Sequence, residues 1–66
     1  MKRYSSRELL YILKRDGWVI KNQEGSHVQL VHPTKKGKVT VKHPDHTIPI
    51  KTLRSILSQA GINLWQ

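Results

Sequence analysis

The chain has 66 residues, no cysteine and a formal net charge of +8, from 12 lysines and arginines against four aspartates and glutamates. It should form one domain over residues 1–66, and without cysteine neither a disulfide framework nor a thiolate metal site is available. The charge favours a polyanionic partner such as RNA, DNA, an acidic protein or an anionic membrane. No apolar run approaches the roughly 20 residues of a membrane span and no signal-like segment follows Met1, so we expect a cytoplasmic protein. Neither expected helix combines a dense lysine face with a bulky aromatic one, so we expect no membrane contact.

Capping and periodicity predict a helix near the N-terminus. Ser5 and Glu8 have the spacing of a capping box, in which each residue's side chain bonds to the other's backbone amide. Apolar residues then recur at helical spacing, and Gly17 is a typical helix stop. The first helix is therefore expected over residues 6–16.

Three strands are expected next, joined as an antiparallel meander. The segments rich in β-branched, aromatic or alternating apolar residues are residues 18–21, 26–32 and 38–42. Residues 22–25 have the composition of a turn. In the first strand, Trp18 and Ile20 are expected to point inward.

Alternation along the strands gives the predicted sheet two different faces. The inward face would carry four apolar side chains, Val28, Leu30, Val39 and Val41. The outward face would carry polar and basic side chains, His27, Gln29, Lys38, Thr40 and Lys42. This open, basic face is the candidate site.

A second helix closes the chain. Pro49 suits its first turn, an apolar stripe begins at Ile50 and ends at Ala60, and Gly61 is a typical stop. The order α-β-β-β-α, with an apolar stripe on each helix and one apolar sheet face, predicts a two-layer α+β domain with both helices on one face of a three-stranded antiparallel sheet. The tail, residues 62–66, is long enough to fold back onto the core.

Several motifs occur in a characteristic order. They are Gly17-Trp18, Gly25-Ser26-His27, His32-Pro33-Thr34-Lys35-Lys36-Gly37, Val39-Thr40-Val41 and the closing helix Ile48 to Ile62. Over nearly the whole chain, from about Ser6 to Ile62, they resemble the HicA family of mRNA interferase toxins. The resemblance implies a double-stranded-RNA-binding-domain-like fold, cleavage of mRNA, and inhibition by a HicB antitoxin that covers the active site.

The resemblance also implies site residues, since the catalytic histidine of the family corresponds to His27. An imidazole exchanges protons near neutral pH, so His27 would act as general acid/base on a ribose 2′-hydroxyl, with no metal or other cofactor. The reaction needs a nearby cation, for which Lys38 and Lys42 are the candidates. Lys51 and Arg54 would grip phosphate from the last helix. The residues expected to contact RNA are Gly25, Ser26, Gln29, Lys38, Lys42, Lys51 and Arg54, with Gly25 chiefly shaping its turn.

The sequence departs from the family pattern at three positions. Many relatives have a second histidine where Val28 stands, a proline where Lys42 stands and a glycine where Lys51 stands. Two other functions are compatible with the sequence: a noncatalytic RNA-binding domain of similar fold, in which His27 is incidental, and an interaction module for acidic proteins.

The remaining histidines are weaker candidates. His43, Asp45 and His46 are closely spaced, but no second compact group of ligands accompanies them, so we predict no metal site. His32, which precedes Pro33 at a strand end, is expected to be structural. Trp18 is expected in the core, and Trp65 could either lie in the core or stack on a base.

Overall fold

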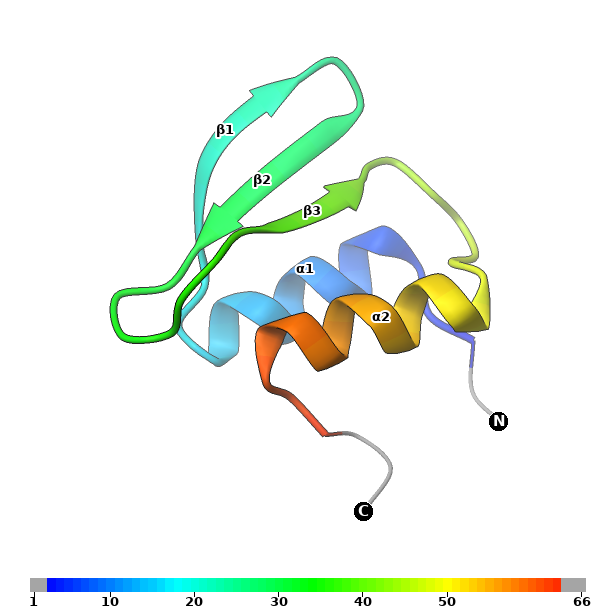
Figure 1. Cartoon of the computed structure of the whole chain (residues 1–66). Coiled ribbons are helices and arrows are strands. Elements are labelled where there is room, and N and C mark those ends of the chain that lie inside the picture. The colour runs from blue at the N-terminus through cyan, green and yellow to red at the C-terminus, as the bar shows by residue number, and fades with distance from the viewer. Residues whose placement is uncertain (1–2, 64–66) are drawn as a thin grey trace.

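The computed structural model describes residues 3–63 and has two layers (Figure 1). The elements, in chain order, are α1 (Ser6–Arg15), β1 (Val19–Glu24), β2 (His27–Val31), β3 (Val39–Lys42) and α2 (Ile50–Ala60). The three strands form an antiparallel sheet in the order β1-β2-β3. Both helices lie on one face of this sheet, so the predicted fold class is confirmed.

Helix α1 begins with the predicted capping box. The Ser5 hydroxyl accepts a hydrogen bond from the Glu8 amide at 3.2 Å, and the Glu8 carboxylate accepts one from the Ser5 amide at 3.1 Å. These two bonds satisfy amides that the first turn of a helix leaves without partners. The helix ends one residue earlier than predicted, with Asp16 as its cap.

The core lies between the sheet and the helices. Its buried apolar side chains come from every element except β1 and are Leu9, Leu10, Leu13, Trp18, Val28, Leu30, Val39, Val41, Ile48, Leu53, Ile56, Leu57 and Ala60. Ile62 packs against this core from the end of α2, whereas residues 64–66 of the predicted tail lie outside the described residues. Ile50, the first residue of the predicted apolar stripe, opens α2 and is 41% exposed.

Strand β1 differs most from its prediction. It extends to Glu24, so the turn contains Gly25 and Ser26 and not residues 22–24. Ile20 pairs with Leu30 and therefore points toward the helix side, as expected, but it is 40% exposed. The reason is that β1 is an edge strand, and Figure 1 shows it as the strand farthest from the helices.

His32 connects three segments at the end of the sheet away from the hairpin turn. Its Nδ1 accepts hydrogen bonds from the amides of Thr34 and Lys35, both at 3.1 Å, so Nε2 carries the proton and donates to the Asp16 carbonyl at 2.8 Å. Its ring packs edge-on against Trp18, with ring centroids 5.2 Å apart. These contacts agree with the predicted structural role of His32.

Candidate catalytic face of the sheet

His27 is the first residue of β2 and occupies the middle of a row across the sheet. It pairs with Glu24 on β1 and with Lys42 on β3, and all three side chains are exposed. Directly opposed residues in antiparallel strands have Cβ atoms about 4.5–5.5 Å apart. Val28 and Val41, the next pair along the strands, are both buried, so this Glu24–His27–Lys42 row lies on the face opposite the helices.

Glu24 is the member of this row that the sequence did not reveal. Its neighbours Asn22 and Gln23 suggested a turn, and only the extension of β1 places Glu24 opposite His27 in the sheet. The Glu24 carboxylate accepts a hydrogen bond from the Asn22 side-chain amide at 3.4 Å. The row thus contains a carboxylate, an imidazole and an ammonium group in register. Such a set can orient an imidazole, exchange a proton and stabilise negative charge on a phosphate.

The rest of the open face changes from polar to apolar away from His27. Gln29 lies between Asn22 and Thr40, and beyond it Val31 pairs with Val19, which is 58% exposed. The predicted outward direction of Gln29 and Thr40 is therefore confirmed. Their role toward RNA stays a prediction.

The two lysines proposed for the phosphate do not lie together. Lys42 pairs with His27, whereas Lys38 precedes β3 and lies beyond the pair Val39–Leu30. A strand rises about 3.3 Å per residue, so the α-carbons of Lys38 and Lys42 are about 13 Å apart. Lys42 is consequently the cation that the sheet places beside His27.

The turn before His27 depends on Gly25. Its φ of 57° is in the left-handed region, and no atom lies within 4 Å of the position that a Cβ would take. Glycine is therefore needed for backbone conformation and not for space. The carbonyl of the next residue, Ser26, accepts a hydrogen bond from the His43 amide at 2.7 Å, which ties the start of β2 to the end of β3.

The His43–Asp45 loop is held by a buried serine. Ser6 is only 1% exposed. Its hydroxyl lies 2.8 Å from His43 Nδ1 and accepts a hydrogen bond from the Asp45 amide at 2.8 Å. The Ser6 amide donates to the Asp45 carbonyl at 2.8 Å. Within residues 3–63, no three acidic or histidine side chains are close enough together to hold a metal ion.

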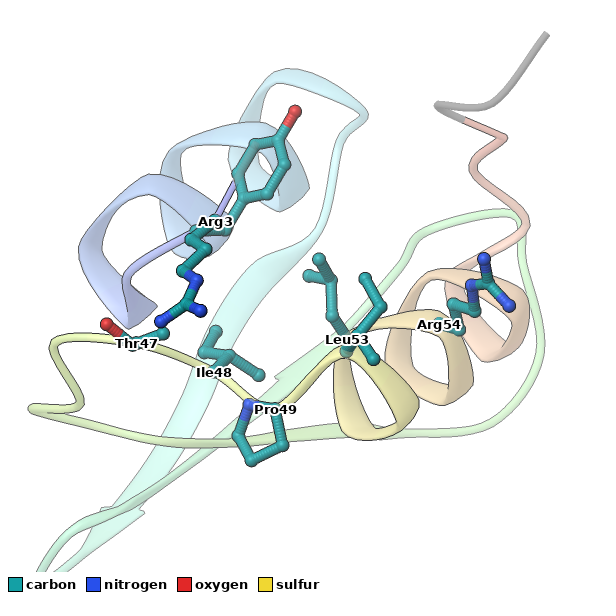
Figure 2. Close-up of a pocket in the computed structure, with 8 residues that line it drawn as sticks. Arg3, Thr47, Ile48, Pro49, Leu53 and Arg54 are labelled. Carbon is teal, nitrogen blue, oxygen red and sulfur yellow. The ribbon is translucent and has the colours of Figure 1, made fainter. Parts of the chain in front are cut away.

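Lys51 and Arg54 are exposed on α2, in the helix layer. Arg54 borders a concavity of about 560 Å³, whose lining is mostly apolar and comprises Arg3, Tyr4, Thr47, Ile48, Pro49, Ile50, Leu53 and Arg54. Figure 2 shows Arg3 and Arg54 on opposite sides of this concavity, with Leu53 between them. The structure therefore does not bring Lys51 and Arg54 together with His27, which lies on the other face of the sheet.

Comparison with known protein families shows which family the chain belongs to. A family model described as "HicA toxin of bacterial toxin-antitoxin" matches residues 6–62. The chain belongs to the HicA toxin family. The matched range coincides with the stretch over which the sequence motifs resemble HicA, so that resemblance is confirmed.

A solved structure supports the assignment to HicA. The structure entitled "HicA3 and HicB3 toxin-antitoxin complex" contains a chain that is 35% identical to this one, with a TM-score of 0.79. The similarity covers 92% of this chain and 98% of that chain. No match was found among curated proteins. Neither helix in residues 3–63 of this HicA is long and apolar enough to cross a membrane.

Proposed function

We propose that this HicA is a ribonuclease that cleaves mRNA with His27 as general acid/base and needs no metal ion. The observation that carries the proposal is the Glu24–His27–Lys42 row, in which an exposed imidazole has a cation on one neighbouring strand and a carboxylate on the other. The net charge of +8 supports a polyanionic substrate.

In the proposed reaction, His27 removes the proton from a ribose 2′-hydroxyl. The 2′-oxygen forms a bond to the adjacent phosphorus, and the bond from phosphorus to the 5′-oxygen of the next nucleotide breaks as that oxygen takes a proton from water. The products are a 2′,3′-cyclic phosphate and a 5′-hydroxyl. Lys42 stabilises the additional negative charge on the phosphate oxygens.

We also propose a HicB-like antitoxin as the protein partner. The related HicA3 was solved in a complex with HicB3. A protein that covers the open face would bury His27 together with the apolar pair Val19 and Val31 at the other end of that face. RNA could then no longer reach His27.

The test is cleavage of a long unstructured RNA by purified protein in excess EDTA. His27→Gln is expected to abolish cleavage, and His46→Gln, which changes an exposed loop histidine, is expected to leave it intact. Both variants must retain the parent's far-UV circular dichroism and its RNA affinity. Equal cleavage by the His27 variant and the parent would remove His27 from the mechanism.

A noncatalytic RNA-binding domain is the second candidate function. Lys51 and Arg54 favour it, because both are exposed on α2 and separated from the face that carries His27. Under this alternative, the parent binds RNA with a strong dependence on salt but never cleaves it, and His27→Gln changes nothing.

A further inference from the structure

A basic groove lies on the helix side of the molecule, between α1 and the loop that follows β3. Its volume is about 490 Å³, and its lining consists of Arg7, Leu10, Tyr11, Lys14 and His43. Residues 7, 11 and 14 recur at helical spacing, so they form one stripe along α1. The groove therefore has a helix on one side and the His43 loop on the other.

The charge of this groove is uncompensated within the described residues. Arg7 and Lys14 are both exposed, and no carboxylate is among the lining residues. The three acidic residues within two positions of the lining residues are engaged elsewhere. Glu8 accepts from the Ser5 amide at 3.1 Å, Asp16 pairs with Lys35 at 2.6 Å, and Asp45 accepts from the Thr47 amide at 3.3 Å.

A buried serine holds the His43 ring at this groove. The Ser6 hydroxyl accepts from the Asp45 amide and lies 2.8 Å from His43 Nδ1, so it fixes the orientation of the ring. His43 Nε2 has no hydrogen-bond partner within residues 3–63, and in the tautomer or charge state that protonates Nε2 it is a donor for an anionic oxygen.

The backbone links the groove to the candidate catalytic residue. The backbone amide of His43 donates to the Ser26 carbonyl at 2.7 Å, and Ser26 directly precedes His27. His43 directly follows Lys42, the cross-strand partner of His27. A chain of phosphates that leaves the open face at His27 would therefore reach His43 across the end of the sheet and continue toward Arg7 and Lys14.

We propose that this α1 groove binds the phosphate backbone of the RNA strand whose scissile linkage lies at His27. Arg7 and Lys14 contact phosphates, the His43 imidazole donates to a phosphate oxygen, and the exposed ring of Tyr11 lies beside a base. The inference rests on the proposed ribonuclease function and extends it. It says that the RNA on one side of the cleaved linkage binds to a surface outside the sheet.

The test measures binding of a 20-nucleotide 2′-O-methyl oligouridylate, which lacks the nucleophilic hydroxyl and is not cleaved. Arg7→Gln and Lys14→Gln are each expected to weaken binding about fivefold at 0.1 M salt, because each removes one phosphate contact. Each should also reduce the slope of log K against log salt by about 0.7. Lys36→Gln, which removes the same charge from the exposed β2–β3 loop, is expected to leave the slope at the parental value.

Cleavage of an unmodified RNA by the same proteins separates the two proposals. Unchanged affinity and slope in Arg7→Gln and Lys14→Gln would overturn the groove proposal, even if the parent cleaves RNA. A reduced slope in both, with no cleavage by the parent, would support the groove as an RNA surface and overturn the ribonuclease function. Weakened binding to a purified HicB-like protein with unchanged RNA binding would assign the groove to the antitoxin and also overturn the proposal.

Discussion

His27 and Lys42 are direct cross-strand partners, and both side chains lie on the open face of the sheet. The Lys42 side chain carries a positive charge at the end of a long flexible stem, so its ammonium group can reach a phosphate that approaches His27. In this chain, therefore, the cation of the proposed reaction comes from β3.

Lys42→Gln is expected to lower kcat for RNA cleavage by about 10- to 100-fold, because a cation that stabilises charge in the transition state is lost. Lys42→Arg should retain most of the activity, since the positive charge remains. The measurement is the rate of cleavage at saturating RNA in excess EDTA. Lys36→Gln serves as the charge-matched control, and an equal loss of kcat in both variants would refute a specific role for Lys42.

Ser6→Ala is expected to lower the free energy of unfolding by about 1–3 kcal/mol, because the variant leaves buried polar groups of the His43–Asp45 loop without their partner. The hydroxyl accepts from the Asp45 amide and contacts His43 Nδ1, each at 2.8 Å. Urea unfolding measures the loss. Ser58→Ala, at an exposed position of α2, should change stability by less than about 0.5 kcal/mol.

The fold was predictable because local signals agreed with one another. The capping pair Ser5 and Glu8 set the start of α1, Gly61 set the end of α2 with a φ of 68°, and alternation placed Val28 and Leu30 in the core. Each of these signals depends on neighbouring residues in the chain. They could therefore be recognised without knowledge of the tertiary structure.

The composition of the row around His27 was not predictable in the same way. Glu24 belongs to it only because β1 continues through a polar segment with a bulge between Ile20 and Asn22, and this continuation is stabilised by pairing with β2. Lys38 and Lys42 are four residues apart, so alternation along the strand predicts both on the outward face. It does not predict that both lie close to His27. The α1 groove escaped prediction because Arg7 and His43, which both line it, are 36 positions apart and are brought together by the tertiary fold.

Gly17→Ala is expected to destabilise the domain by more than the strain of a left-handed residue alone. Gly17 has a φ of 106°, and an added Cβ would lie 2.8 Å from His32 Nε2. Gly37 has a φ of 85° but no atom within 4 Å of the same position, so Gly37→Ala measures the backbone cost, about 1–2 kcal/mol. The difference between the two variants in thermal or urea unfolding gives the cost of displacing His32. Equal losses would show that His32 moves without penalty.

Lys35 is expected to stabilise the domain by joining the C-terminal ends of both helices. Its ammonium group lies 2.6 Å from Asp16 Oδ2 and donates to the Ala60 carbonyl at 2.9 Å. Lys35→Met should cost about 1 kcal/mol, whereas Lys36→Met, on a neighbouring exposed lysine, should cost almost nothing. The Asp16–Lys35 pair is about one-third exposed, so a double-mutant cycle with Asp16→Asn should give a coupling of about 0.5 kcal/mol that decreases as salt rises. A coupling near zero at low salt, with Lys35→Met still destabilising, would assign the effect of Lys35 to the helix carbonyls and not to the ion pair.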